Sequence, residues 1–125
     1  MRNRVVITGM AGLSPIGNDW ASVKEKLLSG KNGVCFMEEW NEFDGLFTRL
    51  AAPVNPFELP IHYTRKKIRS MGNVALYGTL ASELALMDAG LIDQEIIING
   101  QTGVAYGSSS GTPKSVGDFG NMLNN

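Results

Sequence analysis

Residues 4–17, RVVITGMAGLSPIG, constrain the fold of this chain more than any other stretch. The stretch opens with a short β-branched run at residues 5–8, which is the composition of a strand buried on both faces of a sheet. Two glycines then permit a turn, and Pro15 with Gly17 prevents regular structure from resuming at once. The sequence therefore predicts a buried strand that leads into a loop of small residues.

A glycine loop after a strand is also common in nucleotide-binding proteins, but the spacing here differs from theirs. The glycines stand at positions 9, 12 and 17, which fits neither G-x-G-x-x-G nor G-x-x-x-x-G-K-[ST]. The loop is not followed by a Lys-Ser or Lys-Thr pair, and Pro15 stands where a phosphate-binding helix would already have begun. We therefore expect no nucleotide site.

Three helices are predicted, and the longest carries a stripe of small side chains. The first covers residues 20–29 with Asn18 or Asp19 as its cap, the second covers residues 64–89, and the third begins at Pro113 after Thr112. We expect the second helix to be exposed at Arg65 to Lys67 and mostly buried over residues 70–89. Its small residues recur every three or four positions and would let a neighbouring backbone approach closely: Gly72, Ala75, Gly78, Ser82, Ala85 and Ala89.

Four segments together resemble one enzyme family. They are residues 4–19 with the helix after them, Arg65-Lys66 with Met71-Gly72, Asp88-Ala89-Gly90-Leu91, and TGVAYGSSSG at residues 102–111. The combination resembles the beginning of the β-ketoacyl-acyl-carrier-protein synthases, the elongating ketosynthases of the thiolase-like superfamily. The resemblance covers essentially the whole chain, although such an enzyme is much longer. It implies an α/β fold, the incomplete N-terminal part of a thiolase-like layered α-β-α-β-α fold, with residues 1–125 ending before the catalytic cysteine.

The resemblance also implies the activity of the whole enzyme. In such a ketosynthase a cysteine takes an acyl group from its carrier protein, and two histidines assist decarboxylation of malonyl-carrier protein. The resulting carbanion then attacks the thioester, and no cofactor or metal is needed. The implied partners are acyl-carrier protein and a second subunit, in a homodimer or in a heterodimer with a chain-length factor. As an alternative, the parent is itself a chain-length factor, a non-catalytic subunit that shares this scaffold and replaces the cysteine.

The only cysteine and the only histidine do not match the family's catalytic positions. Cys35 lies in GVCFM with no helix after it, whereas the family's nucleophile lies at the N-terminus of a buried helix, where the dipole favours a thiolate. We expect Cys35 to be a small, partly buried apolar residue. His62 follows Pro60 in a loop, and we expect it to be exposed or to cap a helix. The chain is therefore expected to hold no catalytic residue and to be inactive alone.

One substrate-binding residue, Ser110, follows from the resemblance. In the family, the loop after the strand at residues 103–106 contributes a residue beside the acyl tunnel, and the match falls on Ser110. Many fatty-acid-elongating members carry a bulky aliphatic residue there, so Ser110 implies a roomier or more polar pocket. Together with LPIHYTRK at residues 59–66, Ser110 makes the chain resemble ketosynthases of aryl polyene pathways.

The remaining segments are less regular. Residues 46–51 are consistent with a second strand, which in the family pairs with the first. Residues 95–106 fit a β-hairpin around Asn99-Gly100 or, as we favour, a loop before a strand at residues 103–106. An acidic cluster lacks the spacing and the histidines of a metal site, so we expect it to face solvent: Glu38, Glu39, Glu42 and Asp44.

Composition limits the environment of the chain. Eleven basic and twelve acidic side chains give a net charge of −1, which does not favour nucleic acid or an anionic membrane as a partner. The single cysteine excludes an intramolecular disulfide and fits a reducing cytoplasm. There is no signal-peptide cleavage pattern, and the longest uncharged apolar-rich run, residues 70–82, is too short to cross a bilayer. We expect one cytoplasmic domain.

Overall fold

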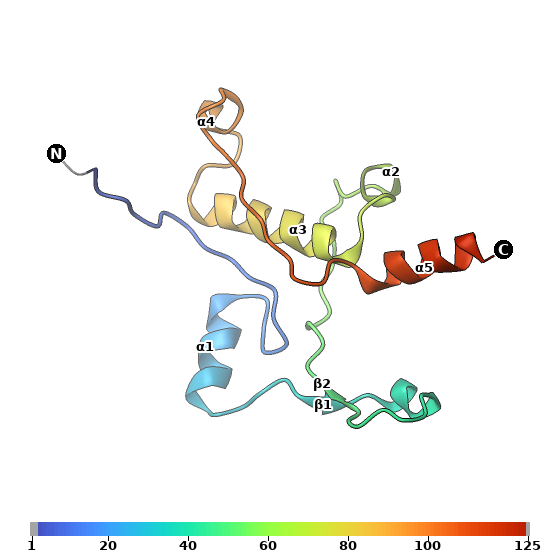
Figure 1. Ribbon diagram of the computed structural model, residues 1–125. Helices are drawn as coiled ribbons and strands as arrows, with labels where there is room; N and C mark the ends of the chain where they lie inside the picture. Colours follow the sequence, from blue (N-terminus) through green and yellow to red (C-terminus); the bar gives the residue numbers. More distant parts are fainter. Residues whose placement is uncertain (1–2, 125) are drawn as a thin grey trace. The chain divides into compact units, whose positions relative to one another are not determined.

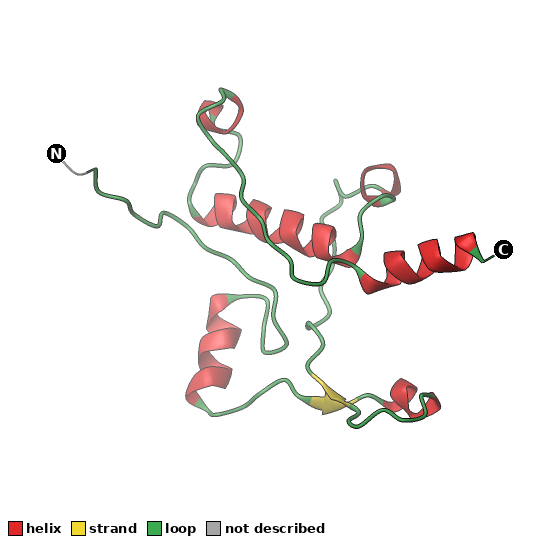
Figure 2. Cartoon of the chain, in the orientation of Figure 1, coloured by secondary structure: helices red, strands yellow, loops and turns green. Residues whose placement is uncertain are grey.

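The computed structural model describes residues 3–124, in which helices and one small sheet are joined by long extended segments (Figures 1 and 2). The elements are α1 (Trp20–Leu28), β1 (Cys35–Phe36), the 3-10 helix η1 (Glu38–Glu42), β2 (Leu50–Ala51), α2 (Arg65–Ile68), α3 (Asn73–Asp88), α4 (Glu95–Ile98) and α5 (Pro113–Leu123). They form two compact units: a small unit of residues 11–58, and a large unit whose described residues are 3–10 and 59–124. None of the helices in the described part of the chain combines the length and the apolar character that a membrane crossing requires.

In the small unit, α1 begins as predicted, with Asp19 as its cap. The backbone N–H of Ser22 donates to Asp19 Oδ1 at 2.9 Å, and the Ser22 hydroxyl donates to Asp19 Oδ2 at 2.6 Å. These hydrogen bonds, led by that of the Ser22 side chain, stabilise the carboxylate and lower the pKa of Asp19. The cap satisfies a backbone donor that has no partner within the helix.

The loop of small residues after position 12 forms a tight turn that is tied to a distant part of the small unit. Ser14 and Gly17 exchange backbone hydrogen bonds of 3.1 and 3.3 Å. The Asn18 side chain donates to the carbonyls of Asn55 and Pro56, and the Asn55 N–H donates to the Ser14 carbonyl. Backbone groups of Asn55 and Pro56, about forty positions further along the chain, therefore hold the turn in place.

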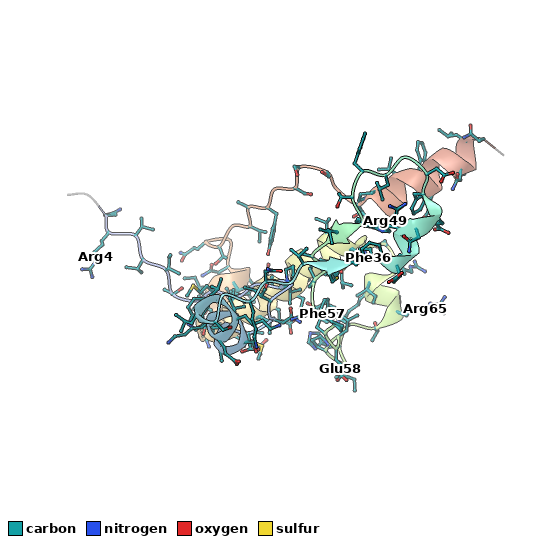
Figure 3. The ribbon with its side chains drawn as sticks, turned by 90° about the horizontal axis from the view of Figure 1, so that it is seen from below. Arg4, Phe36, Arg49, Phe57, Glu58 and Arg65 are labelled. Atoms are coloured by element: carbon teal, nitrogen blue, oxygen red, sulfur yellow. The ribbon has the colours of Figure 1, made fainter. Side chains whose placement is uncertain are left out.

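The only sheet among the described residues is a two-stranded antiparallel ladder. Its register pairs Cys35 with Ala51 and Phe36 with Leu50, and Figure 3 labels Phe36 together with Arg49, the residue before β2. The second strand predicted at residues 46–51 is thus shortened, and it pairs with β1 rather than with residues 5–8. Cys35 is exposed, contrary to the prediction of partial burial, because no second layer of structure within the small unit covers so short a ladder. The acidic cluster is exposed as predicted, although its three glutamates lie in η1.

In the large unit, the helix predicted over residues 64–89 is interrupted. It forms the four-residue α2 and the sixteen-residue α3, with a turn between them in which the Met71 N–H donates to the Ile68 carbonyl. The interruption falls at Ser70 and Gly72, residue types with poor helix propensity. A side chain at Gly72 would also meet Thr112, since a Cβ placed there would lie 2.9 Å from the Thr112 Cβ.

Burial in the large unit is lower than predicted. Leu80 is the one large apolar side chain that is buried among the described residues, at 4% exposure, and Ala75 of α3 is exposed. The basic residues of α2 are exposed, as predicted. The prediction that residues 70–89 are mostly buried is therefore wrong for this structure, in which most of α3 is half-exposed.

The predicted strand at residues 5–8 is extended but unpaired. Val5 and Ile7 are 92% and 85% exposed, and Figure 3 labels Arg4 on the same extended segment. Residues 103–106 are likewise extended without a ladder. A β-branched run favours extended backbone, but a strand also needs a neighbour to accept its hydrogen bonds, and the described part of the chain provides none at either segment.

The small-residue stripe of α3 does admit a neighbouring backbone, as predicted. A Cβ placed on Gly9 would lie 2.5 Å from both the carbonyl oxygen of Ala85 and the backbone nitrogen of Ala89. Next to this contact, the Met10 N–H donates to Asp88 Oδ2 at 2.9 Å. The end of the N-terminal segment is therefore fixed on the last turns of α3.

The C-terminal elements agree only in part with the predictions from the sequence. No hairpin forms around Asn99-Gly100; the loop that we favoured contains the short helix α4 instead. Helix α5 begins at Pro113 after Thr112, as predicted. Its apolar stripe is exposed, at 68% for Val116, 56% for Phe119 and 67% for Leu123.

Candidate functional site

The extended segment before the Ser110 loop is fixed on α3 by Tyr106. In Figure 1 the segment that leads from α4 to α5 crosses α3, and the Tyr106 ring lies 3.5 Å from where a Cβ on Gly78 would be. The Tyr106 hydroxyl donates to the Gly78 carbonyl at 2.6 Å and is also hydrogen-bonded to the Ser82 hydroxyl. The Ser82 hydroxyl lies 2.9 Å from the same carbonyl, so its single proton is directed either to that oxygen or to the Tyr106 hydroxyl oxygen. Two hydroxyl groups therefore converge on one helix carbonyl and anchor the segment.

The loop that carries Ser110 leaves this anchor as an exposed run of small residues. The Gly111 N–H donates to the Ser108 hydroxyl at 3.1 Å, and the hydroxyls of Ser109 and Ser110 are 3.5 Å apart. Gly111 has a φ of +61°, a conformation that side chains disfavour. The structure thus places Ser110 on a loop with its hydroxyl accessible, and it lies outside the pocket described next.

An open pocket of about 190 Å³ lies between the segment that leads into α2 and one face of α3. It is lined by His62, Tyr63, Lys67, Ile68, Met71, Thr79 and Glu83. His62 Nε2 is 2.9 Å from Glu83 Oε1 and 3.1 Å from Oε2, and the His62 ring lies at a tilt against Tyr63 with centroids 4.9 Å apart. His62 is exposed, as predicted, and its ring nitrogen is hydrogen-bonded to the Glu83 carboxylate rather than capping a helix.

The pocket favours an ionised Glu83 and a neutral Tyr63. Burial raises the pKa of Tyr63 to about 12, and the Glu83 carboxylate adds to the rise. Burial opposes the charge on Glu83, but Tyr63, His62 and Lys67 outweigh it and lower the pKa of Glu83. The Glu83 carboxylate, bonded to the His62 imidazole and with the Lys67 ammonium group in the lining of the same pocket, is therefore its electrostatic centre.

Sequence reasoning missed this role of Glu83. His62 and Glu83 are separated by an interrupted helix, so no local spacing pairs them. The one available signal is that Thr79 and Glu83 are four residues apart and share a helix face.

Helix α2 carries a compact group of positive charges beside the pocket. Its exposed cations are Arg65, Lys66, Lys67 and, at its C-terminal end, Arg69. We call these four residues the basic cluster. Their accessibility leaves them free to meet an acidic surface.

Comparison with known proteins identifies the family. Residues 2–123 match the family described as beta-ketoacyl synthase, N-terminal domain. The chain belongs to this family. The identification confirms the resemblance of the sequence to the β-ketoacyl synthases.

Individual family members agree with this identification. The 3-oxoacyl-[acyl-carrier-protein] synthase 2 of Vibrio harveyi is 37% identical over 88% of the chain and 26% of its own length. The corresponding synthase 1 of Buchnera aphidicola (strain Bp) is 34% identical over 89% of the chain and 27% of its own length. The chain thus spans about a quarter of the length of these relatives.

A solved structure confirms the fold class. The crystal structure of a beta-ketoacyl synthase from Burkholderia phymatum STM815 matches 98% of the chain and 30% of its own chain, with a TM-score of 0.89 and 49% identity. The chain therefore has an α/β fold, part of the layered fold of β-ketoacyl synthases.

Proposed function

We propose that this chain is the N-terminal segment of a 3-oxoacyl-[acyl-carrier-protein] synthase. Such an enzyme condenses an acyl thioester with malonyl-acyl-carrier protein by decarboxylative Claisen condensation. The main support is the 49% identity to a β-ketoacyl synthase over 98% of the chain, which greatly exceeds what a shared fold requires. The proposed parent acts in fatty acid or polyketide biosynthesis, with the aryl polyene type favoured by Ser110, and works in the cytoplasm as a homodimer.

Within this proposal, residues 1–125 supply scaffold and substrate contacts rather than catalysis. The condensation needs an activated thiolate and donors for the thioester oxyanion. Cys35 is exposed on β1 with no helix beginning at it, and His62 is engaged by Glu83. Neither arrangement prepares a nucleophile, so the catalytic cysteine and histidines are proposed to lie beyond residue 125.

Within the same proposal, the basic cluster is the surface of this segment that meets the carrier protein. Four exposed cations within five positions favour an acidic partner surface and would speed its approach. A contact of this kind weakens as salt screens the charges. The exposed Ser110 loop is proposed to meet the acyl chain that the carrier delivers.

The test is a reconstitution of the full-length protein that contains this chain. Supplied with hexanoyl- and malonyl-acyl-carrier protein, it should release carbon dioxide and form a 3-oxoacyl product, both measurable by mass spectrometry. Replacing Lys66 by Glu should raise KM for the carrier at low salt and leave kcat nearly unchanged. A folded protein that forms no product, and whose sequence beyond residue 125 lacks the cysteine, would instead favour the chain-length factor.

A further inference from the structure

The loop at residues 107–111 is held on α3 at both of its ends. Before the loop, the Tyr106 hydroxyl donates to the Gly78 carbonyl at 2.6 Å, and the ring lies against Gly78. After the loop, Thr112 lies against Gly72, where an added Cβ would be 2.9 Å from both Cβ and Cγ2 of Thr112. This second contact requires a glycine, because a side chain at position 72 would overlap that of Thr112.

Burial marks Thr112 as the better enclosed of these two anchors. Between residues 101 and 119 it is the one residue that is not exposed. Its carbonyl also accepts the N–H groups of Ser115 and Val116, at 3.0 and 3.3 Å, where α5 begins. The end of the loop is therefore fixed to the start of α3 and to the start of α5.

The distance between the two anchors is short for the loop that joins them. Gly72 and Gly78 are six residues apart, about 9 Å along the helix, whereas six extended residues span about 20 Å. The loop must therefore arch away from α3, and the bond from the Gly111 N–H to the Ser108 hydroxyl shapes the arch. Because a loop with this much slack has no fixed path of its own, its anchors determine where Ser110 lies.

We propose that Tyr106 and Thr112 are positioning residues that fix the path of this loop and thereby the length of acyl chain that fits beside Ser110. The part that concerns the acyl chain rests on the proposed function, whereas the part that concerns the loop path does not. Neither residue needs to touch the substrate. Freeing either anchor lets the loop yield to a long chain, so the distinction between long and short primers becomes weaker.

The first experiment measures the loop by amide hydrogen exchange in the full-length protein that contains this chain. Tyr106→Phe keeps the ring and removes the hydroxyl, and peptides that cover residues 107–111 should then take up deuterium about 2- to 10-fold faster, the range of one neutral hydrogen bond. Gly72→Ala, whose Cβ displaces Thr112, should change the same peptides in the same direction. Gly117→Ala is the matched control and should leave them unchanged, because its Cβ meets nothing within 4 Å among the described residues.

The second experiment tests whether the anchors influence substrate choice through the loop. It compares kcat/KM for a series of acyl-carrier-protein primers of graded length. In Tyr106→Phe the ratio between the most and the least favoured primer should move about 2- to 10-fold toward one, with kcat for the most favoured primer retained. A general loss of structure would instead lower all primers together. Combined with Ser110→Ile, the effect should be non-additive, because both changes act on the same loop.

The remaining outcomes contradict the proposal at identifiable steps. Unchanged exchange over residues 107–111 in folded Tyr106→Phe would mean that the hydroxyl does not hold the loop, and faster exchange in Gly117→Ala as well would mean that the change is global. Faster exchange with an unchanged primer ratio, or strict additivity with Ser110→Ile, would mean that the loop path does not set chain length. If the protein uses no carrier-protein primer while the exchange behaves as expected, the proposed function fails and the anchoring of the loop stands.

Discussion

Ser110 is the residue at which this segment is expected to influence which substrates are accepted. It lies on an exposed loop whose start is anchored by the Tyr106 hydroxyl on the Gly78 carbonyl. A loop held at a fixed point can place a small side chain reproducibly beside a substrate. If Ser110 lies beside the acyl chain as proposed, the size of its side chain would determine how much room that chain has.

Replacing Ser110 by Ile in the full-length protein should shorten the longest acyl chain that it accepts. A chain that must pass the added methyl groups meets overpacking, whereas a shorter chain stops before them. We expect kcat/KM for the longest primers to fall about 10-fold or more, with short primers spared. Competition among acyl-carrier-protein primers of graded length measures the profile. Ser109→Ile is the neighbouring control, and an unchanged chain-length profile in folded Ser110→Ile would show that Ser110 does not contact the acyl chain.

Asp19 gives α1 an acid-sensitive start. Because its pKa is below the usual 3.8 in the folded state, the cap contributes fully above that value, and its contribution is lost as pH falls through the lowered pKa. Asp19→Asn keeps a good capping residue without a titrating charge. Circular dichroism between pH 5 and pH 2 should therefore show a loss of helix in the parent chain that is smaller in Asp19→Asn. Equal losses would assign the acid transition to other carboxylates.

Among the elements, α3 organises the large unit because its small residues receive segments from distant parts of the sequence. Gly9 contacts the helix at Ala85 and Ala89, and Tyr106 contacts it at Gly78 and Ser82. The two contacts differ in tightness. Backbone meets backbone at Gly9, whereas at Gly78 a ring lies at ordinary van der Waals distance.

This difference predicts opposite effects for the same added methyl group. Gly9→Ala should destabilise the chain by about 1–3 kcal/mol, because its Cβ would meet the Ala85 and Ala89 backbone. Gly78→Ala should stabilise it by about 1 kcal/mol, since alanine favours the helix and the Tyr106 ring leaves room. Urea unfolding of the two variants in parallel measures both changes. A destabilised Gly78→Ala would show that Tyr106 packs more tightly than the structure indicates.

Elements specified by neighbouring residues could be predicted from the sequence. The Asp19 cap and the Pro113 start act within a few positions, and α1 and α5 begin accordingly. The strands at residues 5–8 and 103–106 could not be confirmed in this way, because a strand depends on a partner that local composition does not specify. The break between α2 and α3 was missed although Ser70 and Gly72 are poor helix formers, because single residues of this kind also occur inside helices, as Gly78 does in α3.

The same distinction applies to the candidate site. Ser110 was predicted from a motif at residues 102–111 that resembles the family, and its role remains a prediction. The His62–Glu83 pair has no motif and depends on how the chain folds back on itself. Contacts of this second kind require a structure.

At the scale of the whole molecule, we expect residues 1–125 to be unable to perform either half of the condensation. Cys35 and His62 are the chain's only cysteine and histidine, and they belong to different units. After incubation with acyl-carrier protein and malonyl-carrier protein, intact-mass spectrometry should show no acyl adduct and no loss of carbon dioxide. Cys35→Ser is the control for chemical acylation. A stoichiometric thioester on Cys35 would contradict the proposal that the nucleophile lies elsewhere.

The exposure of Cys35 has a further consequence, in redox chemistry. Its sulfur is accessible on β1 and lies 3.8 Å from the sulfur of Met37. In air-saturated buffer, accessible thiols of two chains can oxidise to an intermolecular disulfide, and an accessible thioether can become a sulfoxide. The first product would be read as a dimer, and it would also hide the thiol from any acylating reagent. A band of twice the mass that disappears with dithiothreitol would therefore report the storage history of the sample rather than a subunit interface.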